Sequence, residues 1–297
     1  MTAVQQPPAS PTQTPRPPRR SLHRANAPTS LRANRELLIN LTLRDVRSKY
    51  KRTALGHFWS LLNPLSTMLM YTIVFRYLLG VTSPKGDPSG VDIYALFLLC
   101  GLLPWTFFQN SVNGGMGSLV DNSNLVKKVY FRRDVLVAAT VGSWLVTFCI
   151  EMVVLIVALL AVGGMPLLYI PMALVVMALL TVFALGLGLM LSVANVYFRD
   201  TQHFITILFQ LWFYLTPVLY PLSTVQAQAD KHSGFPIMDV YKLNPMEHFA
   251  QALRNLLYDN RMADWQDLVV CLGAAVVTLC LGAMVFRRFE GRLAEEL

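Results

Sequence analysis

Long apolar segments recur along most of this chain, and polar residues gather between them rather than alternating with them. Six of these segments are each long enough to cross the roughly 30 Å hydrocarbon layer of a membrane as a helix. We place them at residues 58–80, 93–113, 135–162, 168–195, 203–220 and 266–286. The pattern predicts an all-α integral membrane protein, with six transmembrane helices in one domain at residues 58–286.

The segment before the first span predicts a helix that lies along the membrane surface. Ile39, Leu43, Val46 and Tyr50 recur at steps that place them on one helical face. A different face carries three basic side chains, Arg44, Arg47 and Lys51. Basic amphipathic helices lie in the membrane plane with their apolar side in the acyl boundary. We therefore expect an amphipathic interface helix at residues 35–57, and an ordinary helix on a soluble surface is the alternative.

Basic residues between the spans predict the orientation of the chain, because cytoplasmic segments of membrane proteins carry an excess of Lys and Arg. With the N-terminus inside, the cytoplasmic segments hold Arg32, Arg35, Arg44, Arg47, Lys49, Lys51, Arg52, Lys127, Lys128, Arg132, Arg133, Arg199, Arg287, Arg288 and Arg292. The outer loops then hold only Lys85, Lys231, Lys242, Arg254 and Arg261. Both termini are therefore expected in the cytoplasm, with residues 1–34 as a disordered tail and residues 287–297 as a short C-terminal tail.

The composition agrees with a membrane protein and gives no indication of nucleic-acid or metal binding. Only 14% of the residues are charged, whereas soluble proteins usually carry about 25%. The net charge of +8 is spread between apolar segments rather than gathered on one face, so no nucleic-acid partner is expected. The four cysteines lie inside apolar stretches and the five histidines are scattered, so the sequence predicts no metal site.

No motif of a soluble enzyme is found along the chain, and no catalytic residues are predicted. The sequence lacks a GxxxxGK[ST] phosphate-binding loop and a pair of carboxylates spaced for catalysis. Glu151 lies within the third span, where an ionisable group is costly and often functional. A hydrogen bond between helices is the preferred interpretation, because the sequence offers Glu151 no obvious charged companion, and a proton site is the alternative.

Residues 118–134 have the composition of a docking surface. Four cations in this segment are interspersed with apolar side chains, namely Leu125, Val126, Val129, Tyr130 and Phe131. Apolar anchors inside a charged rim are typical of protein interfaces. An amphipathic segment bound to lipid is the alternative.

The loop at residues 221–265 is the longest predicted outer loop, and part of it is expected to be helical. Asn244 suits an N-cap and Pro245 suits the first helical position. Apolar residues then follow at helical spacing, at Met246, Phe249, Leu253 and Leu256. This helix either caps the outer face or dips back into the membrane.

Aromatic residues crowd several of the spans. Belts at the membrane interface and packing are their ordinary roles, but aromatic faces also suit the stacking of sugar rings. The candidates for lining a channel are Trp105, Phe108, Trp144, Phe148, Trp212, Phe213 and Tyr214.

Five segments together, in their order and spacing, resemble one family: "RDVRSKYKRTALGHFWSLLNPL", "GLLPWTFFQNSV", "NSNLVKKVYFRRDVL", "SVANVYFRDTQHFITILFQLWFYLTPVLYP" and "YKLNPMEHFAQALRNLL". They resemble the permease subunit of type 2 ABC transporters that export polysaccharides such as O-antigen, teichoic acid or cell-wall galactan. The resemblance covers residues 35–290. Where the family commonly reads Phe-Pro-Arg, this chain has Phe131, Arg132 and Arg133, which leaves the end of the coupling helix open.

The resemblance implies a role for each segment. The interface helix would gate the access of lipid-linked substrate through Arg44, Arg47, Lys51, Arg52 and Trp59. A coupling helix would insert into a separate ATPase subunit through Asn124, Leu125, Val126, Lys127, Lys128, Val129, Tyr130 and Phe131. The outer gate would include Pro217, Tyr220, Pro221, Asn244, Pro245 and Phe249.

The resemblance also implies partners and a cargo. Two copies of the chain would enclose the channel, and two copies of the ATPase would bind ATP and Mg, so this chain would hold no cofactor itself. The expected function is translocation of a lipid-linked polysaccharide across the bacterial cytoplasmic membrane, without covalent chemistry. The Arg- and Pro-rich tail favours an actinobacterial source, in which the equivalent cargo would be cell-wall galactan.

Three other functions are weighed against this expectation. A type 2 ABC permease for drug or lipid efflux would commonly lack the basic run before the first span. A membrane-embedded glycosyltransferase or polymerase would need catalytic carboxylates or cations in an accessible loop. An ion-coupled carrier would need more ionisable groups within the spans and an internal repeat.

Overall fold

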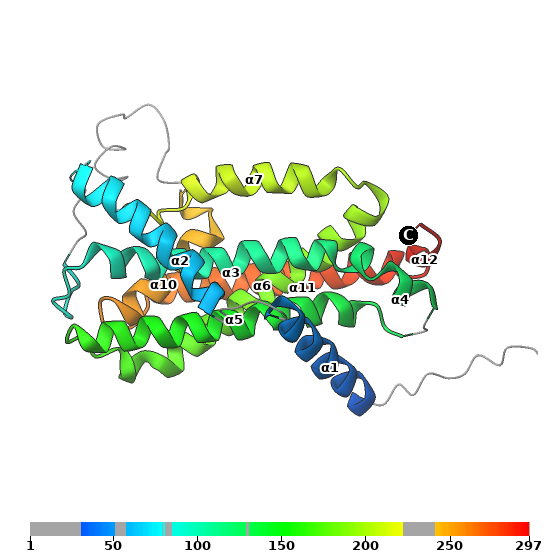
Figure 1. Cartoon of the computed structure of the whole chain (residues 1–297), viewed down its shortest axis with the longest axis horizontal. Coiled ribbons are helices and arrows are strands. Elements are labelled where there is room, and N and C mark those ends of the chain that lie inside the picture. Colours follow the sequence, from blue (N-terminus) through cyan, green and yellow to red (C-terminus); the bar gives the residue numbers. More distant parts are fainter. Residues whose placement is uncertain are drawn as a thin grey trace, which may run out of the picture.

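The described part of the chain contains helices and no strands. The computed structural model describes residues 31–50, 58–78, 80, 85–128, 131–221 and 241–296. Four long helices form the body of the molecule (Figure 1): α3 (Tyr94–Asp121), α5 (Asp134–Ala161), α6 (Ile170–Tyr197) and α11 (Trp265–Phe289). The predicted all-α fold is confirmed for these ranges.

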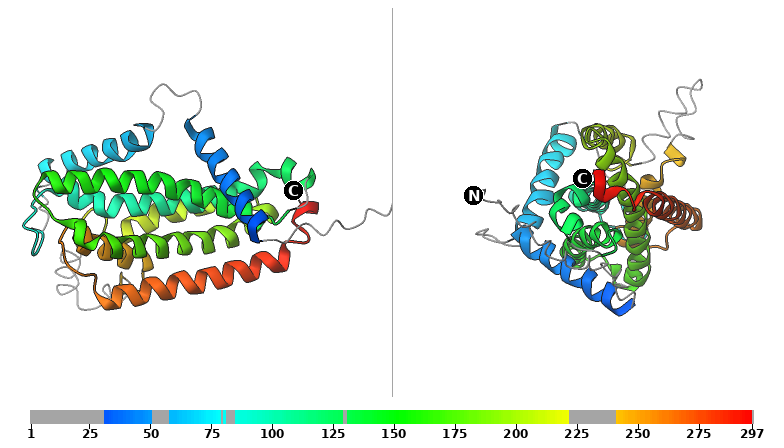
Figure 2. Two further views of the ribbon diagram at one scale, coloured as in Figure 1. Left: turned by 90° about the horizontal axis from the view of Figure 1, so that it is seen from below. Right: turned by 90° about the vertical axis from the view of Figure 1, so that its right-hand side faces the viewer.

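Shorter helices surround this body (Figures 1 and 2). α1 (Leu31–Tyr50) crosses α5 obliquely and begins within the segment predicted as a tail. α2 (Phe58–Tyr71) packs on α3 and continues as the π-helical segment η1 (Thr72–Leu78). α7 (Thr201–Leu215) also contacts α3, and α10 (Pro245–Leu257) is inserted between α3, α6 and α11. The smallest helices are α4 (Ser123–Lys128), η2 (Pro166–Tyr169) and α12 (Leu293–Glu296).

α3 is the central helix of the bundle. Side chains on all of its faces are buried, and Leu98, Phe108 and Met116 have no exposed surface. A helix that is apolar all round is expected to be enclosed by others, and α5 and α6 both pack along α3. The predicted end at residue 113 is too early, because α3 continues through its glycines and packs Gly115 closely against Gly188 of α6.

α6 and α11 pack backbone to backbone at two glycines. A Cβ atom at Gly186 would collide with the backbone of Thr278 and Leu279, and one at Gly282 would collide with the backbone of Gly186. Small residues allow this close approach between helices in membranes. The contact between α6 and α11 is the most extensive of any helix pair in the described ranges.

Four of the six predicted spans are helices long and apolar enough to cross a membrane: α3, α5, α6 together with η2, and α11. The other two predicted spans coincide with α2–η1 and with α7. The α-helical part of each is shorter, at 14 and 15 residues. α7 ends two residues before Pro217, which agrees with the helix break predicted there. The number of six spans stays a prediction.

The two ends of the bundle carry different elements (Figures 1 and 2). We call one end the α4 end, where α4, α12 and the start of α5 lie. The opposite end is the α10 end, with α10, the start of α11 and the segment at residues 85–93. Some predicted sites lie outside the described residues: the tail before residue 31, residues 222–240, the side chain of Trp59, and Lys51, Arg52, Val129 and Tyr130.

Candidate functional site

α4 presents a polar surface while one of its own side chains anchors it to the bundle. Its exposed residues include Asn124, Lys127 and Lys128. Val126 is buried, and it packs with the half-buried Leu125 and Phe131 in an apolar cluster that includes residues of α3, α5 and α12. The cations are therefore held on a short helix that is fixed to the longer ones.

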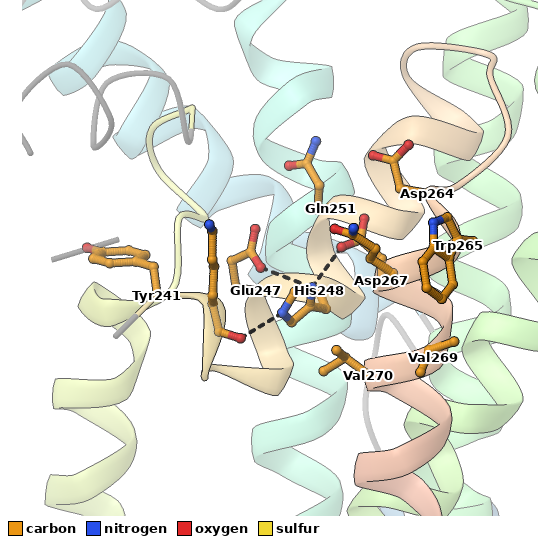
Figure 3. Close-up of a pocket in the computed structure, with 11 residues that line it drawn as sticks. Tyr241, Glu247, His248, Gln251, Asp264, Trp265, Asp267, Val269 and Val270 are labelled. Carbon is orange, nitrogen blue, oxygen red and sulfur yellow. Dashed lines mark hydrogen bonds and ion pairs between the residues drawn. The ribbon is translucent and has the colours of Figure 1, made fainter. Parts of the chain in front are cut away.

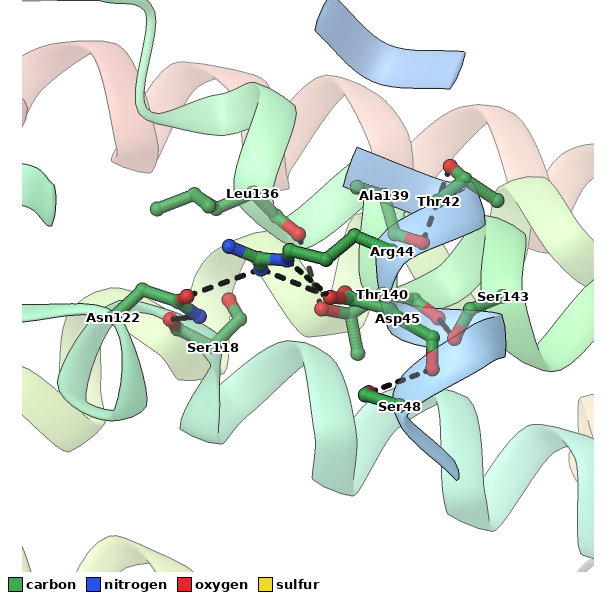
Figure 4. Close-up of polar contacts among 10 residues, drawn as sticks. All are labelled: Thr42, Arg44, Asp45, Ser48, Ser118, Asn122, Leu136, Ala139, Thr140 and Ser143. Carbon is green, nitrogen blue, oxygen red and sulfur yellow. Dashed lines mark hydrogen bonds and ion pairs between the residues drawn. The ribbon is translucent and has the colours of Figure 1, made fainter. Parts of the chain in front are cut away.

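Polar contacts attach α1 to the neighbouring helices (Figure 4). The guanidinium of Arg44 donates to the Asp45 carboxylate at 2.9 Å and to Asn122 Oδ1, just after α3, at 3.1 Å. The hydroxyl of Thr42 donates to the carbonyl of Ala139 in α5 at 3.4 Å. Arg44 thus links the basic helix directly to the segment that leads into α4.

α1 packs on the bundle through other residues than those of the predicted apolar stripe. Leu41 is buried and Leu38 packs beside it in the apolar cluster around α5. Ile39 and Leu43 of the predicted stripe are 44% and 45% exposed, and the basic Arg47 is exposed as well. α1 therefore keeps an apolar stripe and basic side chains at its free surface, which is the arrangement expected of a helix at a membrane surface.

A contact between Lys49 and Trp144, which the sequence did not predict, joins α1 to α5. Lys49 Nζ lies 3.3 Å from the ring centroid of Trp144, and it has no hydrogen-bond partner among the described residues. Burial lowers the pKa of Lys49 to about 8, against the opposing effect of the Asp45 and Glu151 carboxylates. Glu151 is buried and lies close enough to Lys49 for its charge to act on that amine, so Glu151 has a cationic neighbour, contrary to the expectation from sequence. The partners are about 100 residues apart, so only the fold brings them together.

α10 begins as the sequence predicts. Pro245 is the first helical residue, and Asn244 Oδ1 accepts from the backbone N–H of Met246 at 3.1 Å. The same oxygen accepts from the indole N–H of Trp212 at 2.8 Å, and the amide nitrogen donates to the Thr216 hydroxyl at 3.0 Å. The N-cap residue therefore joins α10 to the end of α7.

A buried arginine holds α10 inside the bundle. The guanidinium of Arg254 donates to the carbonyls of Pro217 and Val218 and lies 4.1 Å from the ring centroid of Phe97. Burial lowers the pKa of Arg254 to about 10, so the side chain stays charged at neutral pH. Gly101 leaves room for it, since a Cβ there would meet the guanidinium. α10 thus lies between α3, α6 and α11, and the two predicted positions, capping the outer face or dipping back into the membrane, stay predictions.

The remaining outer-gate candidates lie around the same helix. Phe249 is fully buried and packs on Phe183 of α6. Tyr220 donates to the carbonyl of Tyr214 at 2.7 Å, and its hydroxyl lies 2.7 Å from that of Tyr241. Pro221 is half-buried and is the last described residue before the gap.

A cluster of ionisable side chains lies at the start of α10 and α11, beside a pocket of about 540 Å³ (Figure 3). His248 Nδ1 is 2.7 Å from Asp267 Oδ1 and 3.4 Å from Glu247 Oε2. His248 Nε2 is 2.9 Å from the carbonyl of Lys242. All three side chains are buried. The sequence, in which the histidines are scattered, did not predict that His248 would lie beside two carboxylates.

Proton binding in this cluster follows from its surroundings. Burial acts to lower the pKa of His248, but its hydrogen bonds to Asp267 and to the Lys242 carbonyl, with the nearby carboxylate charges, outweigh burial and raise the pKa. Burial raises the pKa of Glu247 to about 7, although the charge of His248 opposes the shift. Both shifts favour a proton held between His248 and the neighbouring carboxylates.

The channel-lining candidates are divided between the core and the surface. Three are buried within the chain itself: Trp105, Phe108 and Phe148. Three are half-buried, namely Trp144, Trp212 and Phe213, and Tyr214 is exposed. In this conformation, only the last four have surface to offer to a channel.

Comparison with known proteins gives one family along most of the chain. The ABC-2 type transporter family matches residues 36–258. The O-antigen export system permease protein RfbA of Myxococcus xanthus is 32% identical over 263 residues, which cover 89% of this chain and 96% of the relative. RfbA of Klebsiella pneumoniae is 27% identical over 88% of this chain and 95% of the relative.

A more distant relative extends the same group. The polysialic acid transport protein KpsM of Escherichia coli is 22% identical over 84% of this chain and 92% of the relative. The family match and the four long apolar helices together describe a multi-pass membrane protein that acts in transport rather than as an enzyme. The chain belongs to the ABC-2 type transporter family.

Proposed function

We propose that this chain is the membrane-spanning permease subunit of an ATP-driven exporter that moves a lipid-linked polysaccharide across the cytoplasmic membrane. The observation that carries the proposal is similarity over nearly the whole length to permeases named for the export of O-antigen and the transport of polysialic acid. Other relatives are named for the export of capsule polysaccharide. Polysaccharide is the cargo these names share, and cell-wall galactan stays a more specific prediction.

In this proposal the α4 end faces the cytoplasm and the α10 end faces outward. Exposed cations gather at the α4 end: Lys127, Lys128, Arg132, Arg287 and Arg288. Segments rich in Lys and Arg remain on the cytoplasmic side during insertion. α2–η1 and α7 complete six spans, and both termini lie inside.

The energy for transport comes from a separate ATPase, which binds ATP and Mg and docks on α4. Asn124, Lys127 and Lys128 provide the exposed contact surface. The buried Val126, with Leu125 and Phe131, transmits the movement, because these side chains pack against several longer helices. Closure of the ATPase around ATP then changes the contact made at α4, and such a difference in contact between two states is what shifts a conformational equilibrium.

α1 receives the lipid-linked cargo at the cytoplasmic surface. Such a cargo combines a lipid tail with an anionic phosphate-containing head, and α1 offers both an apolar stripe and basic residues at its free surface. Arg44 contacts Asn122 beside α4, so cargo bound on α1 lies close to the element that senses the ATPase. Lys51, Arg52 and Trp59 extend the same surface in this proposal.

A second copy of the chain and a second ATPase complete the transporter. α2 and α7 expose large apolar side chains, including Leu69 and Met70 on α2 and Phe204 and Leu211 on α7. Faces of this kind suit lipid or another apolar helix, and a copy placed against them would enclose a path beside Trp212, Phe213 and Tyr214. Aromatic side chains there allow a sugar chain to slide without fixed hydrogen bonds.

The first experiment is purification of the chain together with the ATPase encoded beside its gene, in lipid nanodiscs. We expect a stable complex whose ATP hydrolysis requires both subunits and increases when lipid-linked polysaccharide is added. An ATPase variant that cannot hydrolyse ATP provides the control. If no nucleotide-binding subunit associates, the proposal fails; if hydrolysis responds to hydrophobic drugs or phospholipid instead, the efflux alternative is the correct one.

A further inference from the structure

The cluster formed by Glu247, His248 and Asp267 has no part in the proposed transport cycle, and its geometry requires explanation. Glu247 and His248 lie in the first turn of α10, and Asp267 lies in the first turn of α11. Their exposed fractions are 4%, 8% and 8%. Buried carboxylates are rare unless they are paired or bind a cation.

The hydrogen bond on one side of the imidazole fixes what the other side can do. A backbone carbonyl can only accept, so His248 Nε2, 2.9 Å from the Lys242 carbonyl, carries a hydrogen and donates it. This leaves Nδ1 directed at the oxygens of Asp267 and Glu247 (Figure 3). Ionised carboxylates only accept as well, so a cation must lie between these atoms, either a proton or a metal ion.

The arrangement has the features of a metal site. One potential ligand atom from each of the three side chains lies within 4.8 Å of the others. A histidine that binds a metal usually donates its other ring N–H to a carbonyl or carboxylate, which orients the ring, and the Lys242 carbonyl occupies that position. Ligand atoms at about 2.0–2.2 Å from an ion are roughly 3 Å apart. The two separations from His248 Nδ1, 2.7 and 3.4 Å, lie close to this value, and the third, between the carboxylates, is within 4.8 Å.

The neighbouring pocket supplies access and the remaining coordination positions. Its volume is about 540 Å³, and Gln251 and Asp264 bring further oxygen atoms to its lining. Water from this pocket can complete the coordination shell of an ion held by three protein ligands.

We infer that Glu247, His248 and Asp267 form a binding site for a divalent transition-metal ion, best matched by Zn²⁺, which joins the start of α10 to the start of α11. Imidazole with carboxylates favours zinc and its neighbours in the first transition row, whereas Ca²⁺ and Mg²⁺ prefer oxygen ligands alone. The ion takes the place of the shared proton and balances both carboxylates. It also restrains the buried helix α10 against α11, whatever cargo the transporter carries.

The test uses the full chain, purified through a tag without histidine and stripped of metal with a chelator. We expect one equivalent of Zn²⁺ per chain after dialysis, measured by elemental analysis, and a rise in the thermal midpoint of about 5 °C with excess Zn²⁺. Equal concentrations of Ca²⁺ and Mg²⁺ should have a much smaller effect. A wild-type chain that retains no Zn²⁺, or one that prefers Ca²⁺, overturns the inference.

Variants locate the ion. Glu247→Gln, His248→Gln and Asp267→Asn should each weaken Zn²⁺ binding at least about tenfold, since each removes one of three ligands. His203→Ala on α7 is the matched control, because His203 is exposed and lies outside both the cluster and the lining of the pocket, and this variant should bind as the wild type does. Unchanged Zn²⁺ content in the three cluster variants would contradict the assignment.

Cobalt gives a second measurement that does not depend on stability. Co²⁺ bound to the wild-type chain should give visible absorption bands of a nitrogen and oxygen site, and these should be lost in folded His248→Gln. Bands that persist in this variant would overturn the role of His248. Neither measurement needs ATPase or cargo, so their failure is separate from failure of the proposed transport function.

Discussion

At the α10 end, the guanidinium of Arg254 is buried and donates to two carbonyls of the same chain, whereas at the α4 end Lys127 and Lys128 are exposed. The polar groups of Asn244 and His248 likewise find their partners within the chain. The α10 end thus directs several of its polar groups to partners within the chain, although Arg254 Nε and Asn255 Nδ2 have no hydrogen-bond partner among the described residues. The α4 end instead exposes Lys127 and Lys128 to another molecule.

The difference matters because the loss of a partner costs more folding free energy for a buried polar group than for an exposed one. A buried group that loses its partner keeps the full cost of its desolvation, about 1–3 kcal/mol or more for charged groups. Exposed ion pairs contribute only about 0–1 kcal/mol. Substitutions at the α10 end should therefore act on folding, and those at the α4 end should act on association.

The largest expected effect is that of Arg254→Met. The methionine fills similar space but leaves the carbonyls of Pro217 and Val218 without their donor, so we expect a loss of about 3–5 kcal/mol in folding stability. Thermal unfolding in detergent measures it. Arg254→Lys retains the charge without the planar guanidinium, so its folding stability should lie between those of the wild type and the Met variant. A Met variant as stable as the wild type would remove the contrast between the ends.

A smaller loss is expected for Asn244→Ala. The substitution removes the N-cap of α10 together with the bonds to Trp212 and Thr216, which should cost about 2 kcal/mol by the same unfolding measurement. Asn244→Asp keeps the acceptor for Met246 and Trp212 and should lose only part of this. If Ala and Asp variants are equally destabilised, the N-cap acceptor is not the important group.

The pair Lys127→Glu with Lys128→Glu should leave folding unchanged to within about 0.5 kcal/mol, because both side chains are exposed. Its effect should fall on the ATPase, with affinity reduced about tenfold, equivalent to about 1.4 kcal/mol. Co-purification measures the association, and membrane insertion should be normal.

Arg287→Glu with Arg288→Glu is the matched control for that pair, since it makes the same charge change at exposed residues of α11 near the same end. It should reduce association much less. Equal losses in the two pairs would indicate a general electrostatic effect rather than docking on α4, and normal association of the α4 variant would exclude α4 as the dock.

The smallest effect concerns pH and the half-buried Lys49. Its pKa is lowered from 10.5 to about 8, so between these values the unfolded chain binds more protons than the folded one. Stability therefore rises with pH across this window, and α1 should pack more firmly on α5. Protease protection of α1 at pH 7.5 and 10 measures this, and Lys49→Met should abolish the difference. A pH dependence retained in the Met variant would assign it to another group.

Local patterns in the sequence predicted the elements, and contacts between distant residues determined the rest. The N-cap at Asn244, Pro245 at the first helical position and the break near Pro217 were found because each depends on neighbours in the chain. The contacts that hold α10 were not predicted, because Arg254 was counted as a loop charge when its partners lie about 36 residues away.

The residues of the candidate site likewise divide into those predicted from local sequence and those that only the fold brings together. The exposed polar residues of α4 follow from composition, whereas the pairing of Lys49 with Trp144 and Glu151 requires α1 to cross α5. Asp267 could not be matched with His248 from the sequence, because two helix starts must meet before the side chains do. Position also separates the buried Phe108 from the exposed Tyr214, both of which were predicted to line the channel as aromatic residues of the spans.

The glycine contact between α6 and α11 has a mechanical consequence. The backbones of α6 and α11 meet at Gly186 and Gly282, so sliding of one helix along the other would drive side chains into the main chain. These two helices should therefore move as one rigid unit. α7 packs on its neighbours far less extensively and is the more compliant element. Spin labels placed on α6 and α11 would therefore provide a rigid reference, and distances from them to a label on α7 would measure the displacement of α7 during transport.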